Sequence, residues 1–496
     1  MNRPVFRPPC SSDAVPLPGG FAAQLRKCLP AGRALFGHEE CAPFEADGLM
    51  MFRRRPPAVV FPDNEEEVAR IVNCCRRAKV PLITRGAGTG LSGGALPHED
   101  GVLLVTSRMN RILQIDPKAR AARVQPGTRN LAVSEAARPS GLFYAPDPSS
   151  QQACSIGGNV AENSGGVRCL KYGLTVHCVS ALRAITADGE AAEFRADAPG
   201  LDLLALLHGS EGLLAVITEI TLRLSPLPES SRTALAGFAS AAAAGDAVAA
   251  VIAEGLVPSG LEMMDRLAMQ AAENFAAAGY PTECAALLIA EVDGRREDAA
   301  RDMRRMRDIL TRCGANPFWE AKDDAERARF WRGRKSAFPA MGAIRPDYYC
   351  MDGTIPRKHL GRTLEQIAAL SEKYDLPCAN VFHAADGNLH PLILFDGGDE
   401  SAVKRALQFG SDIMQLCLQA GGTITGEHGV GVEKIGEMCA QFAPDELETF
   451  RAVKRAFDAE EFLNPGKAVP TLNRCAEFGM MHVRHGTEQF PGLPRF

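Results

Sequence analysis

The first clear hydrophobic pattern in the chain predicts a βαβ unit. The continuous apolar run at 58–61 is typical of a short buried strand. Asp63 or Asn64 then caps a helix in which apolar residues recur at the spacing i, i+3, i+4, i+7 and glutamates occupy the first turn. The runs at 80–84 and 102–105 predict two further strands, and a glycine-rich segment separates them.

A second pattern, in which strands and helices alternate, follows a break after 217–224. That segment alternates as a strand, and Ser225-Pro226-Leu227-Pro228 ends it, so we place a domain boundary there. The later segments predict strands near 285–292 and 349–355, and helices near 299–313, 323–334, 360–374 and 403–419. This order predicts an antiparallel sheet with helices on one face, and therefore an α+β fold. We expect an N-terminal segment, a first domain, a cap domain, a C-terminal return and a tail at 1–50, 51–228, 229–420, 421–470 and 471–496.

The segment 85–94, RGAGTGLSGG, is glycine-rich and directly follows a predicted strand. Glycine has no Cβ, so the backbone N–H groups of such a loop can approach a phosphate closely. The segment matches the pattern G-x-G-x-x-G, but a strand follows where a nicotinamide-binding helix would begin. We expect a different phosphorylated ligand, which Arg85 helps to hold; a plain glycine-rich turn is the alternative.

A second glycine-rich segment covers residues 145–173. It is dense in serine, asparagine and backbone donors, and it is too long for a loop that only connects two elements. It suits a second wall around a large polar cofactor, and a long surface loop is the alternative. Near the C-terminus, Asn464-Pro465-Gly466-Lys467 forms a compact turn that either folds back onto this cofactor or simply ends a helix.

Two histidines flank a predicted hairpin turn at Asp386-Gly387. If those two residues are the turn, His383 lies directly opposite His390, with Cβ atoms about 4.5–5.5 Å apart. A single histidine in a sheet is usually a satisfied core residue. Two as cross-strand partners favour a shared cation, because two imidazolium groups would repel each other.

The glycine-flanked segment 423–431 supplies Glu427 as a third ligand and His428 beside it. Two histidines and one glutamate with open positions are typical of a catalytic metal site. Zn²⁺ fits this set, and Fe²⁺ or Mn²⁺ suit it as well. His428 could stay free of the metal and act as a general base, because imidazole titrates near neutral pH. The alternative is a loop acid beside a solvent-facing histidine.

Basic residues cluster around Trp331, at Arg332, Arg334, Lys335 and Arg345. Such charges are mostly a solvated helix face. One of them, with Arg334 the first choice, could bind a substrate carboxylate in bidentate fashion.

Composition excludes several classes of function. The chain has 496 residues, a net charge of −5 and no basic block, so we expect no nucleic-acid partner. No apolar run reaches the roughly 20 residues that span a membrane, and the N-terminus lacks the apolar core of a signal peptide. The 15 scattered cysteines form no C-x-x-C pair. This pattern predicts reduced thiols in the cytoplasm, with no iron–sulfur cluster and no structural zinc.

The motifs RGAGTGLSGG, CSIGGNVAENSGG, HAADGNLH, GEHGVG and LNPGK, in this order, resemble the flavoproteins of the vanillyl-alcohol-oxidase group. Within that group they resemble the D-2-hydroxy-acid dehydrogenases, and more closely the FAD-binding catalytic subunits of bacterial glycolate oxidases. The resemblance extends through PDYYCMDGTIPR at 347–357 to RCAEFGMMHVRHG at 474–486, so it covers nearly the whole chain. It implies a two-part FAD-binding domain, a cap domain over the substrate, and a C-terminal return to the FAD.

The resemblance also implies roles for single residues. His383, His390 and Glu427 would hold a divalent metal, with His428 as the base. FAD would be non-covalent, because residues 85–96 contain neither histidine nor cysteine. The residues implied to bind it are Arg85, Gly86, Gly88, Thr89, Gly90, Gly93, Gly94, Pro146, Asp147, Ser155, Gly157, Gly158, Asn159, Gly165, Ile217 and Asn464.

The activity implied is oxidation of a small 2-hydroxy acid by hydride transfer to FAD. Relatives that act on longer dicarboxylates have a lysine near residue 350; Cys350 stands here and favours glycolate or D-lactate. Electrons would pass to companion subunits, one a second flavoprotein and one an iron–sulfur protein, and these would bring the cytoplasmic chain to the inner face of the membrane. Two alternatives stay open: a stand-alone D-lactate or D-2-hydroxyglutarate dehydrogenase, and a non-catalytic FAD electron-transfer subunit.

Overall fold

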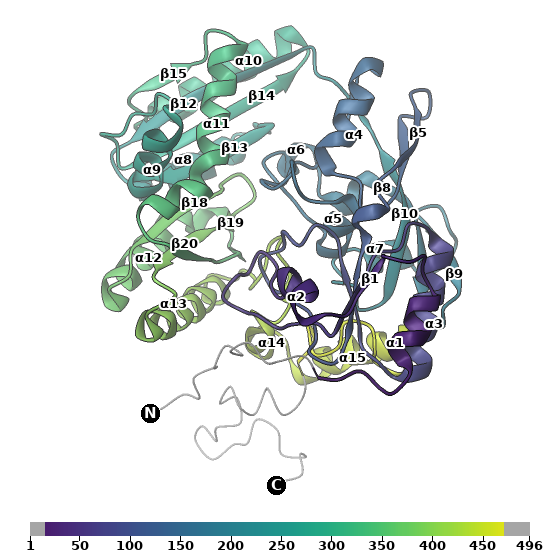
Figure 1. Cartoon of the computed structure of the whole chain (residues 1–496). Coiled ribbons are helices and arrows are strands. Elements are labelled where there is room, and N and C mark those ends of the chain that lie inside the picture. Colours follow the sequence, from purple (N-terminus) through teal and green to yellow (C-terminus); the bar gives the residue numbers. More distant parts are fainter. Residues whose placement is uncertain (1–14, 471–496) are drawn as a thin grey trace.

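The computed structural model of the protein describes residues 15–470 (Figure 1). The expected tail at 471–496 and the first 14 residues of the expected N-terminal segment lie outside the described residues. The rest of that N-terminal segment contains α1 (Phe21–Lys27), β1 (Ala34–Leu35) and α2 (His38–Cys41).

The predicted βαβ unit is confirmed as part of a four-stranded sheet. Its strands run in the order β1-β2-β4-β3, where β2 is Ala58–Val60, β3 is Leu82–Arg85 and β4 is Val102–Val105. Both β2 and β3 are parallel to β4. The intervening helix α3 (Glu65–Ala78) begins at Asn64, whose side chain accepts a hydrogen bond from the Glu67 N–H. Of the two expected caps, Asn64 is therefore the one that acts.

A second sheet of five antiparallel strands completes the first domain, on the right of Figure 1. Its order is β5-β6-β10-β8-β9, and the long strand β10 (Ala215–Arg223) confirms the alternation predicted near 217–224. The remaining strands are β5 (Ile112–Asp116), β6 (Ala121–Val124), β8 (Val179–Thr186) and β9 (Ala191–Arg195). Between β6 and β8 lie α4 (Asn130–Ala137) and α5 (Ile156–Glu162), and α5 lies within the second glycine-rich segment.

The part of the chain after residue 229 forms a large antiparallel sheet, as predicted. Its central order is β15-β12-β14-β13-β18, and β20 extends it by pairing with both β18 and β16. The strands are β12 (Ser230–Phe238), β13 (Gly260–Asp265), β14 (Ala286–Gly294), β15 (Phe318–Glu320), β16 (Asp347–Cys350), β17 (Gly353–Thr354), β18 (Cys378–His383), β19 (Asn388–Leu389) and β20 (Pro391–Phe395).

Helices cover both faces of this sheet, so the expectation of helices on one face alone was wrong. Neighbouring residues of β14 show this, because successive side chains of a strand point to opposite faces. Leu288 packs in a core cluster with α8 (Ala241–Ala253), α10 (Arg296–Arg312), α12 (Leu360–Tyr374) and α13 (Glu400–Gln419). Leu287 packs in another cluster with α9 (Arg266–Ala276) and α11 (Asp324–Ala340).

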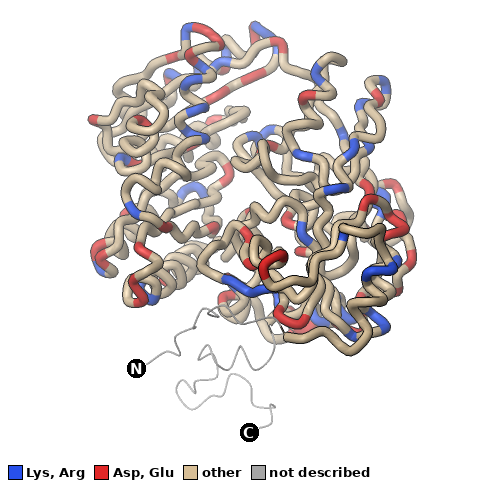
Figure 2. Tube along the Cα trace, viewed as in Figure 1, with Lys and Arg blue, Asp and Glu red and all other residues tan. Residues whose placement is uncertain are grey.

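The chain then returns to the first sheet through α14 (Ile435–Gln441) and α15 (Pro444–Phe457). Leu463 forms a parallel bridge with Leu82 of β3, and the Asn464 N–H donates to the Leu82 carbonyl at 2.8 Å. Figure 2 shows acidic and basic residues interspersed along the chain, in line with the absence of a basic block. Within residues 15–470, no helix combines the length and apolar character needed to cross a membrane.

Candidate functional site

Two histidines meet on one face of the cap sheet, but in a different register from the one predicted. β18 pairs with β19 so that His383 lies opposite Asn388, and the turn therefore contains the four residues 384–387 instead of two. His390 lies two residues beyond the position opposite His383. Because side chains alternate along a strand, this shift of two keeps both imidazoles on the same face. Their ring centroids are 5.2 Å apart, and both side chains are buried.

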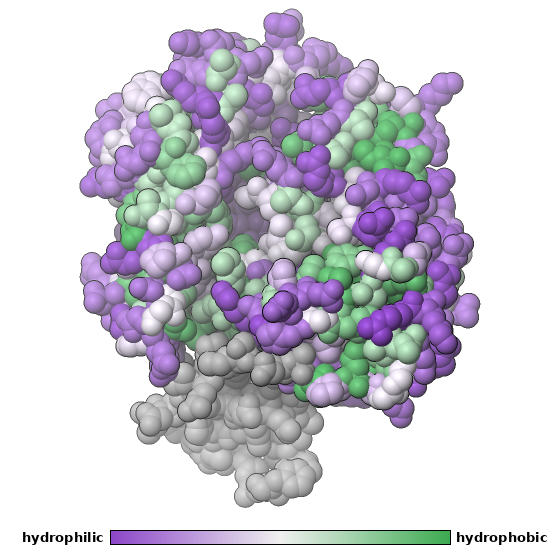
Figure 3. Space-filling model, in the orientation of Figure 1, coloured by the Kyte–Doolittle hydropathy of each residue, from purple (hydrophilic) through white to green (hydrophobic). Residues whose placement is uncertain are grey.

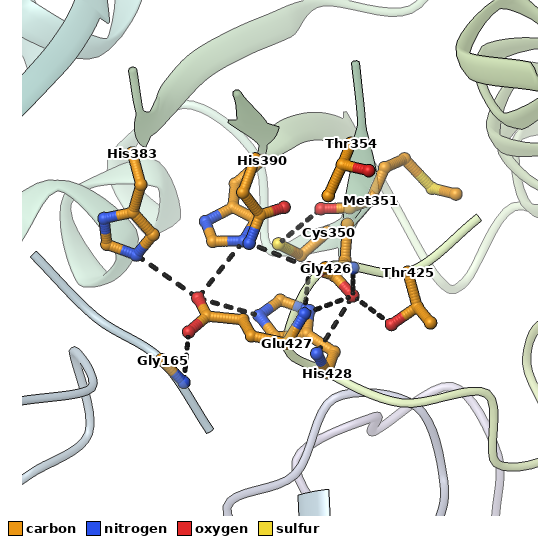
Figure 4. Close-up of polar contacts among 12 residues, drawn as sticks. Gly165, Cys350, Met351, Thr354, His383, His390, Thr425, Gly426, Glu427 and His428 are labelled. Carbon is orange, nitrogen blue, oxygen red and sulfur yellow. Dashed lines mark hydrogen bonds and ion pairs between the residues drawn. The ribbon is translucent and has the colours of Figure 1, made fainter. Parts of the chain in front are cut away.

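Glu427 reaches these two imidazoles from a loop on the other side of the site (Figure 4). Its Oε1 lies 3.2 Å from His383 Nε2, 3.4 Å from His390 Nε2 and 4.0 Å from His428 Nε2. Its Oε2 accepts a hydrogen bond from the Gly165 N–H at 3.0 Å. Burial alone would raise the pKa of Glu427, but the neighbouring imidazoles, with His383 the strongest, lower it to about 2.

His428 lies against His390, with ring centroids 4.7 Å apart and planes at 13°. Burial is the largest cause that lowers the pKa of His428 to about 4. The imidazole is therefore neutral at physiological pH and able to accept a proton.

Glu262 orients His383 by contacting the ring nitrogen that faces away from Glu427. This residue was not predicted from the sequence. Its Oε1 is 2.8 Å from His383 Nδ1, and its Oε2 bonds to Arg334 Nε at 2.9 Å and Nη2 at 2.7 Å. A carboxylate only accepts, so the Nδ1 of His383 carries the proton and its Nε2 lone pair is free to bind a cation. One signal existed in the sequence: Glu262 is an acid inside the otherwise apolar run GLEMM of β13, which Asp265 ends.

These residues fit a divalent cation. The ligand atoms of His383, His390 and Glu427 all lie within 4.8 Å of one another. His390 Nε2 and His428 Nδ1 are buried and have no hydrogen-bond partner among the described residues. A buried imidazole nitrogen that lacks a partner and faces a carboxylate is what a metal ligand offers. A second group, Asp352 with His390 and His428, also meets the same 4.8 Å distance.

The glycine-rich loop at 85–94 is held from within and from the C-terminal return. Arg85 Nη2 and Nε donate to the Ala95 carbonyl at 2.8 and 3.2 Å, so the guanidinium ties the two ends of the loop together. Asn464 Nδ2 and Lys467 Nζ donate to the Gly94 carbonyl at 3.0 and 2.9 Å. Direct contact of Arg85 or Asn464 with a cofactor stays a prediction.

A cavity of about 480 Å³ opens where this loop meets the second glycine-rich segment. Gly86 and Ser155 line it from the two segments, and a Cβ on Gly86 would lie 2.2 Å from Ser155 Oγ. The whole lining is Gly86, Ala87, Ser107, Asn110, Ile112, Gly127, Thr128, Arg129, Ala132, Ala153 and Ser155. Small and polar side chains thus bound a space that suits a large polar cofactor. On the face drawn in Figure 3, the surface is hollowed between the cap and the first domain.

Apart from Ile217, the other residues expected at the cofactor fall into three groups. Gly88, Thr89, Gly90 and Gly93 continue the glycine-rich loop; Gly157, Gly158 and Asn159 lie in α5; Pro146, Asp147 and Gly165 lie in the loops on either side of it. Asn159 Oδ1 accepts from Asn130 Nδ2 at 2.9 Å, and Asp147 pairs with Arg168 at 3.4 Å. Ile217 packs in the hydrophobic core of the first domain.

Known proteins resemble this chain along most of its length. The FAD binding domain family matches residues 56–195, and the C-terminal domain of FAD linked oxidases matches residues 227–468. Glycolate oxidase subunit GlcD of Escherichia coli (strain K12) is 58% identical over 95% of each chain. GlcD of Bacillus subtilis (strain 168) is 36% identical over 88% of this chain and 92% of its own. The mitochondrial D-lactate dehydrogenase (cytochrome) of Arabidopsis thaliana is 31% identical over 84% and 74%.

Solved structures share the fold at much lower identity. p-Cresol methylhydroxylase with substrate bound aligns with a TM-score of 0.77 at 17% identity, over 91% of this chain and 97% of its own. The 4-ethylphenol oxidase of Gulosibacter chungangensis aligns with a TM-score of 0.77 at 15% identity, over 92% and 97%. The resemblance drawn from the motifs is thereby confirmed. The chain belongs to the FAD-linked oxidases of the vanillyl-alcohol-oxidase group, in the branch of glycolate oxidase subunit GlcD.

Proposed function

We propose that this protein oxidises a small 2-hydroxy acid, with glycolate to glyoxylate as the first reaction and D-lactate to pyruvate as a second. The observation that carries the proposal is the convergence of His383, His390 and Glu427 within 4.8 Å, beside the neutral imidazole of His428. The names of the relatives, glycolate oxidase subunit and D-lactate dehydrogenase, support the same substrate class.

In this proposal the chain binds and orients the substrate and moves one proton. When bound, FAD supplies the hydride acceptor, and a divalent cation, Zn²⁺ first and Fe²⁺ or Mn²⁺ as alternatives, supplies a Lewis acid. His428 accepts the proton of the substrate hydroxyl, while Glu262 keeps the Nε2 of His383 facing Glu427. Arg334 binds the substrate carboxylate with the N–H groups that Glu262 leaves free.

The proposed FAD site is non-covalent and lies between the two glycine-rich segments. The cavity lined by Gly86 and Ser155 supports this placement, as does the match of residues 56–195 to a FAD binding domain. The five residue ranges given above for the parts of the chain stay a proposal. In that division, residues 421–470 return to complete the site, and their contacts with Gly94 support it.

Substrate size is proposed from Cys350. This residue ends β16 and is buried, and its thiol offers no positive charge to a second carboxylate. A small monocarboxylate therefore suits the site better than a dicarboxylate.

Electrons must then leave the flavin for an acceptor outside this chain. Neither candidate ligand group within residues 15–470 contains a cysteine, the residue that holds iron–sulfur clusters. The Escherichia coli relative is named as a subunit. We propose a second FAD-binding subunit and an iron–sulfur subunit as partners, and a cytoplasmic chain held at the inner membrane face through them.

One alternative function has specific support. D-lactate dehydrogenases of Anaerostipes hadrus and Archaeoglobus fulgidus are 31% and 33% identical to this chain, so a stand-alone D-lactate or D-2-hydroxyglutarate dehydrogenase stays open. The buried histidines and Glu427 argue against a non-catalytic electron-transfer subunit.

Anaerobic bleaching of the bound flavin tests the proposal. The purified holoprotein is mixed in turn with glycolate, D-lactate, L-lactate and D-2-hydroxyglutarate, and the flavin absorbance is followed. We expect glycolate and D-lactate to bleach the flavin rapidly, and a chelator to stop the bleaching. Bleaching by D-2-hydroxyglutarate alone would favour the alternative, and no bleaching by any of the four acids would contradict both.

A further inference from the structure

A second layer of polar contacts lies behind the three proposed ligands and centres on Asp352. This residue follows β16 and is completely buried. Its Oδ2 accepts hydrogen bonds from Thr425 Oγ1 at 2.6 Å, from the His428 N–H at 2.9 Å and from the Gly426 N–H at 3.0 Å. The Glu427 N–H lies 3.2 Å from Oδ1. Four consecutive residues, all labelled in Figure 4, thus direct donors at one carboxylate.

Lys434 balances the buried charge of this carboxylate. Its Nζ lies 3.1 Å from Asp352 Oδ2 and 3.0 Å from the Gly429 carbonyl, and its side chain is buried as well. A buried carboxylate is tolerated when it is paired and hydrogen-bonded in this way. The pair also ties the start of α14 to the strand that ends at Cys350, so both ends of the loop meet the same anchor.

The two groups of candidate ligands share His390 and differ in their acid, Glu427 or Asp352. The hydrogen bonds that each carboxylate accepts distinguish these two acids. Glu427 accepts the Gly165 N–H at Oε2 and presents Oε1 to the imidazoles. Asp352 already accepts five hydrogen bonds at Oδ2 alone, from four loop donors and Lys434. Oδ2 therefore has little lone-pair density left for a cation, and Oδ1, which lies 3.4 Å from His390 Nε2, already accepts the Glu427 N–H at 3.2 Å. Asp352 is thus better suited to hold the loop than to bind the metal.

We propose that Asp352 is a positioning residue: it sets the backbone of the 425–428 loop and thereby fixes where Glu427 and His428 point. The inference rests on the proposed function, because it concerns the same metal and base. It goes beyond that proposal by making metal affinity depend on a carboxylate that does not touch the metal.

Two variants test this inference in the FAD-loaded protein. Asp352→Asn replaces an acceptor oxygen with N–H groups that face the loop donors, so the loop must move. We expect Mn²⁺, titrated into chelator-stripped holoprotein and followed by electron paramagnetic resonance, to bind at least about 10-fold more weakly, with glycolate turnover about 100-fold lower. Thr425→Val removes one donor to Asp352 and no ligand atom, and should weaken Mn²⁺ binding about fivefold, the equivalent of one hydrogen bond.

Asp458→Asn is the matched control. Asp458 is also buried, pairs with a buried lysine, Lys454 at 2.6 Å, and accepts the Leu463 N–H at 2.7 Å, but it lies outside the 425–428 loop. If the inference holds, this variant loses thermal stability but binds Mn²⁺ within twofold of the wild type. Wild-type Mn²⁺ affinity and turnover in Thr425→Val would overturn the inference, even if Asp352→Asn fails to fold. Equal losses of affinity in the control would do the same. Failure of the wild type itself to bind Mn²⁺ would overturn the proposed metal site and this inference together.

Discussion

At the scale of single residues, the site depends on buried charges that constrain one another. Arg334, Glu262 and His383 form a continuous chain in which each side chain is at most 3% exposed. Such a network is favourable only when every member keeps its partner. The chemistry of the site is therefore sensitive to residues that never touch the substrate.

The role of His428 can be tested by removing its imidazole. His428→Ala takes away the proposed proton acceptor and leaves the glycine-rich segments intact. We expect reduction of the flavin by glycolate to fall about 1,000-fold, within the usual range for loss of a general base. The flavin absorbance spectrum and the FAD content per chain should stay at wild-type levels. Full activity in this variant would remove the base assignment.

Glu262→Gln tests the support behind His383. The amide cannot balance the charge of buried Arg334, and it no longer fixes the Nδ1 proton of His383 as firmly. We expect metal content per FAD, measured by mass spectrometry, to drop with about 10-fold to 100-fold weaker affinity. Glu65→Gln is the control, because Glu65 pairs with Arg183 in the first domain, far from these ligands in the chain. A loss of metal in the control as large as that in Glu262→Gln would refute the specific role.

Asp147 gives a prediction for the dependence of stability on pH. Burial raises its pKa to about 6, even though Arg168 acts in the opposite direction. The native state therefore holds this proton more tightly than the unfolded chain, and the resulting stabilisation is complete below about pH 4 and lost as pH rises through 6. The change amounts to about 3 kcal/mol. In Asp147→Asn this dependence is absent. The melting temperature of the wild type minus that of the variant should thus decrease as the pH rises from 4.5 to 7.5. Parallel curves of melting temperature against pH would contradict the assignment.

At the scale of elements, local patterns in the sequence were enough for the βαβ unit, for β10 and for helices such as α10, α12 and α13. The apolar repeats of α3 and α10 and the glycine-rich break before β4 were all recovered. The register of the β18–β19 hairpin was not, because Asp386-Gly387 suggests a two-residue turn whereas four residues form the loop. The helices on the second face of the cap sheet were missed for another reason. The burial of both faces of β14 shows only as a long apolar run, which does not say what covers each face.

The partners of the ligands were also beyond the sequence pattern. Asp352 and Glu262 lie 75 and 121 residues from the side chains that they hold, Glu427 and His383. No periodicity links such positions, and only the folded sheet brings them together. The convergence of the three proposed ligands could be predicted because two of them flank one turn and the third lies in a glycine-rich loop of unusual polarity.

The hairpin loop offers a test of how strictly the register matters. Gly387 has a φ of +80°, and a Cβ there would lie 2.3 Å from the Ile355 carbonyl oxygen. Gly387→Ala should therefore displace the loop between His383 and His390 and lower both the melting temperature and the metal content. Gly421→Ala is a close control, since Gly421 has the same φ of +80° but open space around it. Backbone strain alone costs about 1 kcal/mol in both variants. An equal loss in both would show that the loop position does not matter.

At the scale of the whole molecule, the proposed metal site joins segments from distant parts of the chain. Gly165 of the first domain donates to Glu427, while Glu262 and the two histidines come from the cap sheet. The carboxylate of Glu211, near the end of the first domain, accepts the N–H groups of Val430 and Gly431 at 2.7 Å each. The glycine-rich loop at 85–94 also contacts this segment directly, because Ser92 Oγ donates to the His428 carbonyl at 2.8 Å, so displacement of one loop should loosen the other.

The C-terminal return gives the most direct test of this dependence. Lys467 is buried, and its Nζ donates to the carbonyls of Gly94 and Leu96 at the end of the glycine-rich loop. Lys467→Met keeps the length of the side chain but removes this donor from both carbonyls. The Gly94 carbonyl keeps Asn464 Nδ2 as a donor, whereas the Leu96 carbonyl loses its Lys467 contact at a cost of about 1–3 kcal/mol. We expect FAD to bind at least about 10-fold more weakly, as measured by fluorescence of released flavin on dilution.

Lys454→Met is the control, because Lys454 also donates to buried carbonyls, those of Leu213 and Leu463, but to none in the glycine-rich loop. If the return acts through the loop, the control loses stability while its FAD affinity changes less than that of Lys467→Met. Equal FAD affinity in the two variants would mean that the return stabilises the fold without shaping the cofactor site.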